Sequence, residues 1–466
     1  MEKIKIGFLP FYIKLYDDIG SGAKARPRLE PFARKLTDEL EKKGFEVFLS
    51  PFCRIKPEFD AAVANFEANG CRAIVTWHAA YSPSLESIEA LSGTDLPLVV
   101  LDTTETYAFD PTQDPGEISY CHGIHGVMDM CSMLHQRGKA FAIAAGHISD
   151  SDVIDRTVGY LHAAIAATSL RGSRTGSIGG SFDGMGDFLV NDKEMLERFG
   201  VTVVYPEKGE LAACKAQVTD AEVEAEIASD NEKCGRLADF SGEAHERTTR
   251  SNLAVRKWIE KQNLSAWTAN FREIHPDTLG LDVMPFFEAC KGMARGTGYA
   301  GEGDVLTASL VGALLHGFEK STFVEIFCPD WKGNTLLLSH MGEYNIALAS
   351  GKPKMFEAPF VFTEAKEPIV AYGRYRGGKA VFMNLYRSAK AFKMLISPVE
   401  MVEVAEQDDK FQNKVRGWMR PHMPVADFLE AISHVGGTHH SALVYDAKVS
   451  EIEYFCDILG IPYDVI

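Results

Sequence analysis

Short apolar runs alternate with longer amphipathic segments along the first third of the chain. Four runs rich in Ile, Val, Leu and Phe have the length of buried strands: residues 3–11, 45–52, 71–77 and 96–104. Between them, residues 27–44 and 57–70 repeat apolar side chains every three or four positions, as amphipathic helices do. This alternation predicts a mostly parallel sheet covered by helices, in a Rossmann-like domain over residues 1–172.

The pattern changes twice farther along the chain. A second α/β domain is predicted for residues 173–318, where Thr219 and Glu222 are spaced as a capping box that opens a helix. Over residues 319–466, apolar runs such as "STFVEIFCPDWKGNTLLLSHM" are joined by Gly, Pro and Asn turns. We therefore expect an α/β fold of three domains, the last of which is β-rich and barrel-like.

The composition narrows the range of partners. The formal net charge is −17, which argues against nucleic acid or an anionic membrane surface, because both attract basic patches. The nine cysteines include no CxxC pair, and the first residues lack the apolar core and cleavage site of a signal peptide. No apolar window has the length of a membrane span. We predict a cytoplasmic protein with reduced thiols.

Glycines surround the first candidate for chemistry, in "GYAGEGD" at residues 298–304. Asp304 precedes a helical run and is expected to act as its N-cap. Glu302 lies farther out between two glycines, and such small neighbours allow another group to approach closely. Because helix capping does not explain this carboxylate, Glu302 is a candidate functional residue.

A second candidate pair comes from a predicted hairpin with Lys332 and Gly333 at its turn. Counting outward along the two strands pairs Glu325 with His340, and cross-strand partners share one face of a sheet. Both residues lie in apolar strands, where a carboxylate and an imidazole need a polar partner. Two interpretations stay open: the side chains hydrogen-bond to each other, or they bind a metal ion between them.

Two adjacent histidines, His439 and His440, follow a pair of glycines in "GGTHHS". Adjacent side chains on a strand point to opposite faces, so we expect at most one of the two to face a given site. Together with two carboxylates, imidazoles would form a ligand set of nitrogen and oxygen atoms. Such a set suits manganese, cobalt or a similar divalent ion, and differs from a thiolate-type zinc site.

Five segments, in the same order, resemble those of the L-arabinose isomerase and L-fucose isomerase superfamily, most closely the L-arabinose isomerase branch. They are "WHAAYSP", "HGVMDMCSMLHQRGKAFAIAAGH", "GGSFDGMGDF", "GYAGEGD" and "GGTHHS". By position, the resemblance implies that four residues bind a divalent metal: Glu302, Glu325, His340 and His440. It also implies proton transfer by the two glutamates, and substrate contacts by a further set: His125, Met185, Tyr81 and His439.

The resemblance further implies an activity and an assembly. The expected activity is that of a metal-dependent aldose–ketose isomerase, an intramolecular oxidoreductase that acts on a small free sugar through a cis-enediol proton transfer. Manganese is the expected metal, with cobalt or magnesium as alternatives. The expected assembly is a homo-oligomer, a trimer or hexamer, in which His125 reaches the site of a neighbouring subunit.

Two segments depart from the pattern of the family. "LPFYIKLYDDIG" stands where the family has Gly-Ser-Gln-His-Leu-Tyr-Gly, and "LDTTETY" replaces its His-Thr-Gln segment. The departures lie at the sugar-recognition end and leave the identity of the sugar open. One alternative is an isomerase of a modified or phosphorylated sugar, with Lys14, Lys24 and Arg26 available for a phosphate. Another is a non-catalytic sugar-binding protein.

Overall fold

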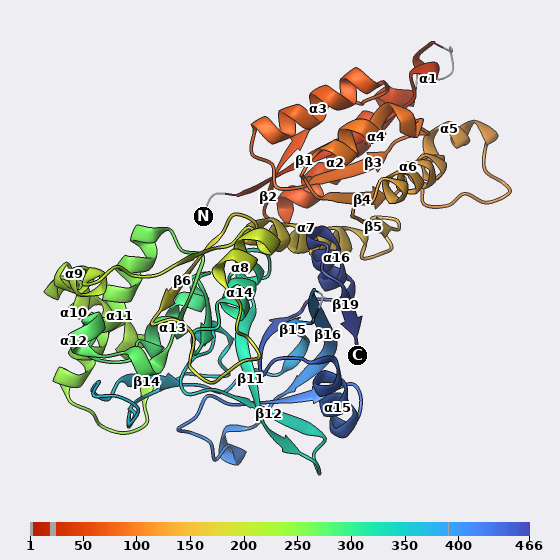
Figure 1. Cartoon of the computed structure of the whole chain (residues 1–466). Coiled ribbons are helices and arrows are strands. Elements are labelled where there is room, and N and C mark those ends of the chain that lie inside the picture. The colour runs from red at the N-terminus through yellow and green to blue at the C-terminus, as the bar shows by residue number, and fades with distance from the viewer. Residues whose placement is uncertain (1–2, 19–24, 390) are drawn as a thin grey trace. The chain divides into compact units, whose positions relative to one another are not determined.

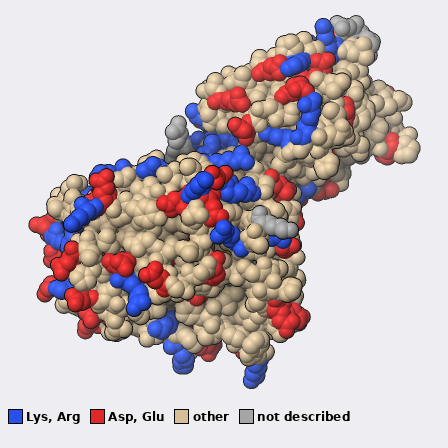
Figure 2. All heavy atoms as spheres, viewed as in Figure 1, with Lys and Arg blue, Asp and Glu red and all other residues tan. Residues whose placement is uncertain are grey.

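The structure is a computed structural model that describes residues 3–18, 25–389 and 391–466. It divides into two compact units, Met1–Ile165 and Ala166–Ile466. Among the residues in these described ranges, no helix is both long and apolar enough to cross a membrane. On the face shown in Figure 2, lysines and arginines lie among aspartates and glutamates.

The first unit is built on a five-stranded parallel sheet with the strand order β2-β1-β3-β4-β5 (Figure 1). The strands are β1 (Ile4–Phe11), β2 (Phe45–Leu49), β3 (Ile74–His78), β4 (Leu98–Asp102) and β5 (Phe141–Ala145). The main helices between them are α2 (Ala25–Lys42), α3 (Lys56–Ala68), α4 (Ser84–Gly93) and α6 (Ile124–Gln136). This confirms the predicted Rossmann-like region. Ligands of such sheets bind at the carboxyl ends of the strands, where the strand order reverses, which here is between β1 and β3.

The helices of the first unit bury the apolar positions that the sequence pattern indicates. In α3, Phe59, Ala62, Val63 and Phe66 are buried and follow the helical period. They pack in one core with residues of the strands, including Leu9 of β1. Burial of one face of the helix and of the strand side chains fixes the helix on the sheet.

The second unit begins with a smaller parallel sheet of the order β10-β9-β6-β7. Its strands are β6 (Arg174–Ile178), β7 (Thr202–Val204), β9 (Ala266–Ala269) and β10 (Gly298–Gly301). Helices around it include α8 (Asp192–Phe199), α10 (Asp220–Lys233), α11 (Gly242–Gln262), α13 (Phe286–Ala294) and α14 (Val305–Gly317). The predicted capping box opens α10, with Thr219 accepting from the backbone N–H of Glu222.

The rest of the second unit is rich in β-structure and includes a closed six-stranded barrel. Its order is β15-β18-β11-β12-β17-β16, and the pairing of β15 with β16 closes the ring. The strands are β11 (Ser321–Asp330), β12 (Thr335–Ser339), β15 (Gly378–Arg387), β16 (Phe392–Val402), β17 (Gly417–Pro421) and β18 (His440–Tyr445). This confirms the barrel-like expectation, whereas the domain boundaries at residues 172 and 318 stay predictions.

Helix α14 links the small sheet to the barrel and packs closely on β10. All but one of its thirteen residues are buried, so the neighbouring elements enclose the helix on nearly every side. Gly298 at the start of β10 allows this contact, because a Cβ atom there would lie 2.2 Å from the backbone N of Gly312. The turn between β10 and α14 is therefore held at a fixed position by backbone packing.

We expect Gly298→Ala to destabilise the protein, because the added methyl group would press on helix backbone that has no room to move. Overpacking of this kind costs about 1–3 kcal/mol of the free energy of unfolding. Gly242→Ala at the start of α11 is the matched control, since a Cβ atom there meets nothing within 4 Å. Chemical denaturation of both variants checks this, and equal midpoints would contradict it.

Candidate active site with a metal centre

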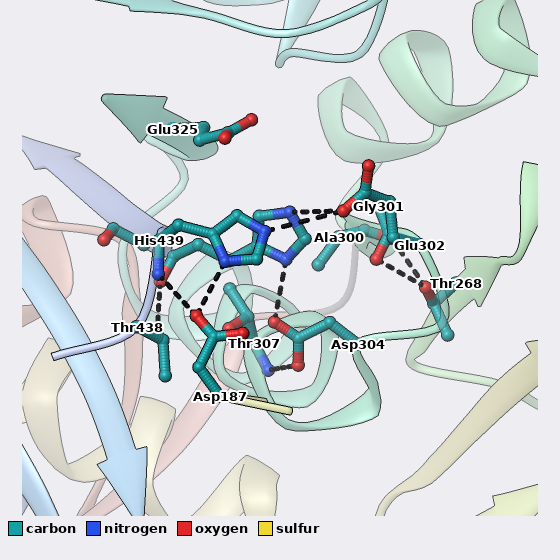
Figure 3. A network of polar contacts seen from close by, with 12 residues as sticks. Asp187, Thr268, Ala300, Gly301, Glu302, Asp304, Thr307, Glu325, Thr438 and His439 are labelled. Carbon is teal, nitrogen blue, oxygen red and sulfur yellow. Dashed lines mark hydrogen bonds and ion pairs between the residues drawn. The ribbon is translucent and has the colours of Figure 1, made fainter. Parts of the chain in front are cut away.

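Glu302 occupies a tight turn between β10 and α14 and has a left-handed backbone, with φ +63°. The flanking glycines are required by close packing. A Cβ atom on Gly303 would lie 2.1 Å from the carbonyl oxygen of Gly180, and one on Gly301 would lie 2.8 Å from Cε1 of His340. Asp304 is the N-cap of α14, as predicted, and accepts from the backbone N–H of Thr307 at 2.8 Å (Figure 3).

The predicted pairing of Glu325 with His340 is wrong by one residue. Glu325 is opposite Ser339, because a β-bulge between Ile326 and Cys328 shifts the register of the hairpin. The two side chains nevertheless meet, with Nε2 of His340 3.6 Å from Oε2 of Glu325, since His340 lies just beyond the end of β12.

The histidine pair comes from the start of β18. His440 is the first residue of that strand and is opposite Glu325 on β11. His439 precedes the strand, so the alternation of faces does not govern it. Both imidazoles approach Oε2 of Glu302, at 3.5 Å for His439 and 3.6 Å for His440. The expectation that only one of them faces the site is therefore wrong.

Three histidines of the site each place Nδ1 against a carboxylate oxygen. The pairs are His340 with Glu343 at 2.5 Å, His439 with Asp187 at 2.6 Å, and His440 with Asp304 at 3.0 Å. A carboxylate accepts a hydrogen bond, so these contacts assign the proton to Nδ1 and turn Nε2 toward the site. Histidines that bind metals almost always have such a partner behind them.

The Nε2 atom of His440 shows that the site fits a metal ion. It is buried and has no hydrogen-bond partner among the residues that the structure describes. Two groups of three residues share His440: Glu302, His439 and His440, and Glu325, His340 and His440. Within each group, one possible ligand atom from each residue lies within 4.8 Å of the others. A buried nitrogen without a partner is costly, and a divalent cation would satisfy it.

The two glutamates have opposite pKa shifts. Burial raises the pKa of Glu325. Burial also acts to raise the pKa of Glu302, but the hydrogen bond from His439 and the nearby His340 outweigh it and hold that pKa below its usual value. Burial opposes protonation of His340, yet the adjacent Glu343 raises its pKa to about 9. The site thus holds two carboxylates in different electrostatic surroundings.

The remaining predicted residues lie elsewhere in the chain. Tyr81 and His125 belong to the first unit, where their rings meet edge to face at 4.8 Å. Met185 lies in the loop of residues 179–190 of the second unit, half-buried, and its backbone N–H donates to the carbonyl of Phe182. Their substrate contacts stay predictions.

Sequence reasoning missed two carboxylates of the site, Asp187 and Glu343. Glu343 follows His340 by three residues in "SHMGE", a spacing that could have indicated a local partner. Asp187 is 252 residues away from His439, so only the resemblance of "GGSFDGMGDF" to a family segment pointed to that loop.

We expect Asp304→Ala to lower the free energy of unfolding of the metal-free protein by about 1.5–5 kcal/mol. Loss of an N-cap costs about 0.5–2 kcal/mol, and a buried imidazole left without a partner costs about 1–3 kcal/mol. Asp304→Asn is the matched control, because the amide oxygen of the new side chain still caps α14. We therefore expect this variant to lose less of the free energy of unfolding. Denaturation in the presence of a chelator measures both, and equal losses would contradict this account.

The comparisons with known proteins identify the family. The L-arabinose isomerase central domain matches residues 189–316, and the L-arabinose isomerase C-terminal domain matches residues 320–462. An L-arabinose isomerase of Herpetosiphon aurantiacus is 25% identical over 85% of this chain and 80% of its own length. Another, of Shouchella clausii, is 24% identical over 97% of this chain and 91% of its own length. The chain therefore belongs to the L-arabinose isomerase family of aldose–ketose isomerases, which are intramolecular oxidoreductases.

Proposed function

We propose that the chain is a metal-dependent isomerase of a small free aldose. Four residues would hold the metal ion: Glu302, Glu325, His340 and His440. The observation that carries the proposal is the buried Nε2 atom of His440, which has no hydrogen-bond partner in the described ranges and faces two carboxylates. Oxygen and imidazole ligands favour manganese, with cobalt or magnesium as alternatives.

The residues suit the proton transfers of this reaction. Isomerisation moves a proton between two neighbouring carbons and a second one between their oxygens, through a cis-enediol. When held by these four residues, a divalent metal ion would supply the chemistry of a Lewis acid, which stabilises negative charge on oxygen. One of Glu302 and Glu325 takes the carbon-bound proton and returns it to the next carbon, while the other moves protons between the oxygens. Each such group contributes roughly 10²–10⁴-fold to the rate.

We further propose that the first unit contributes to sugar recognition within a homo-oligomer, a trimer or hexamer. His125 would reach the site of a neighbouring subunit, and Tyr81, whose ring meets that of His125, would line the sugar pocket. Near His125 in the sequence, three residues have exposed apolar side chains: Ile118, Ile124 and Met128. A group of exposed apolar side chains favours contact with another protein surface, and a second copy of the chain would provide it.

A phosphorylated substrate has less support. Arg26 lies near Asp17 at 3.7 Å and near Glu30 at 3.9 Å, so these carboxylates already balance its charge. Lys24 lies outside the described residues. The family membership likewise argues against a non-catalytic sugar-binding protein.

Melting curves and turnover of His440→Ala and His439→Ala test the metal site. A ligand stabilises the folded protein by an amount set by its affinity, so manganese should raise the melting temperature of the chelator-treated wild type. We expect His440→Ala to lose this rise, because the variant lacks a buried ligand atom. His439→Ala should keep the rise and lose turnover about 10–100-fold, as changes beside a metal site do.

Turnover is measured on a panel of pentoses and hexoses, with and without manganese, by following the ketose formed. Retention of the manganese effect in His440→Ala together with its loss in His439→Ala would reverse the two roles. No conversion of any aldose by the metal-loaded wild type would refute the proposed activity.

Met128→Glu tests the proposed assembly, because it places a charge at an exposed apolar position on α6, the helix that carries His125. We expect sedimentation to show a trimer or hexamer for the wild type and a smaller species for the variant, with turnover reduced. The far-UV circular dichroism of the variant should match that of the wild type, since the side chain is exposed. A wild type that sediments as a fully active monomer would refute the shared site.

A further inference from the structure

We propose that Asp187 is a positioning residue, which holds His439 at the open side of the site so that its Nε2 atom faces Glu302 and the substrate. This inference rests on the proposed isomerase function and adds a residue from a different part of the chain. Asp187 lies in the loop of residues 179–190, between β6 and α8, and points toward His439 (Figure 3).

One oxygen of Asp187 holds His439 at two points. Its Oδ2 accepts from the backbone N–H of His439 at 2.9 Å and from Nδ1 of the same residue at 2.6 Å. The first contact fixes the main chain just before β18, and the second fixes the rotation of the ring. With Nδ1 occupied, Nε2 is directed toward Oε2 of Glu302 at 3.5 Å.

Exposure separates His439 from the other two histidines. The side chain of His439 is 32% exposed, whereas those of His340 and His440 are 5% and 0% exposed. A buried imidazole can meet only a metal ion or the protein, but a partly exposed one can also meet a sugar that enters from solvent. His439 is therefore placed to contact the oxygens of the substrate beside Glu302.

The loop that carries Asp187 is fixed against the site at two other points. The ring of Phe188 stacks on that of His440, with centroids 5.1 Å apart and an interplanar angle of 8°. The backbone N–H of Phe182 donates to the carbonyl of Glu302 at 2.9 Å. Asp187 lies between these two contacts, so its carboxylate has a rigid base from which to orient His439.

A purely structural role predicts a different outcome from a positioning role. The carboxylate and the imidazole are both about one-third exposed, and ion pairs at such positions contribute little to folding. Removal of Asp187 should therefore leave the melting temperature of the metal-free protein nearly unchanged. What should change is the orientation of the His439 ring, and with it the chemical step.

The test compares Asp187→Ala with Asp187→Asn, and uses Asp183→Ala as the matched control, which removes an exposed carboxylate from the same loop. In crystals of Asp187→Ala we expect the His439 ring to turn away from Glu302. The kcat of Asp187→Ala should fall about 10–100-fold with little change in KM, while manganese still raises the melting temperature of this variant. Asp187→Asn should keep the ring position and most of the turnover, since one amide oxygen can accept both hydrogen bonds.

Asp183→Ala should match the wild type in all three measurements. An unmoved ring and unchanged kcat in Asp187→Ala would overturn the proposal, as would loss of the manganese effect, which would make His439 a metal ligand. If the wild type converts no aldose, the proposed function fails separately. The ring position and the manganese effect then still decide whether Asp187 positions His439.

Discussion

The burial of imidazoles and carboxylates at one end of the barrel is the constraint on which the rest of the site depends. His440 and Asp304 are both fully buried, and polar groups taken out of water cost free energy unless they find partners. The carboxylate of Asp304 finds two such partners: it accepts from the backbone N–H of Thr307, which caps α14, and from Nδ1 of His440. The same buried contact therefore stabilises a helix, orients an imidazole and leaves Nε2 directed at the centre.

This constraint explains why segments far apart in the sequence converge. The turn after β10 supplies Glu302, β11 supplies Glu325, the end of β12 supplies His340, and the start of β18 supplies His440. Strands β12, β11 and β18 are neighbours in the barrel, so the side chains they contribute to the site need little further adjustment. The amide of Asn384 on β15 donates to the carbonyl oxygen of His440 at 2.9 Å and anchors the start of β18. Adjacent strands of the barrel thus carry the site, and the neighbouring strand β15 supports it.

Much of the fold and part of the site could be predicted from the sequence. The periodicity of apolar residues indicated the parallel sheets and the β-rich region, and glycines on both sides singled out Glu302. The hairpin register failed beyond the bulge at Phe327, because a bulge is decided by twist and packing that a count of residues does not contain. The partner of His439 could not be found locally, since Asp187 approaches it only in the folded chain.

The left-handed backbone of Glu302 has a consequence for directed evolution. Side chains other than Gly, Asn and Asp rarely adopt this conformation, and it costs of order 1–3 kcal/mol. Glycine would relieve that cost, so a screen for thermal tolerance alone would favour loss of the carboxylate. Stability and the proton transfer proposed for Glu302 are opposed at this one residue, which is a common trade-off where a functional group occupies a strained turn. Libraries built for robustness therefore need to hold residue 302 constant or select for turnover at every round.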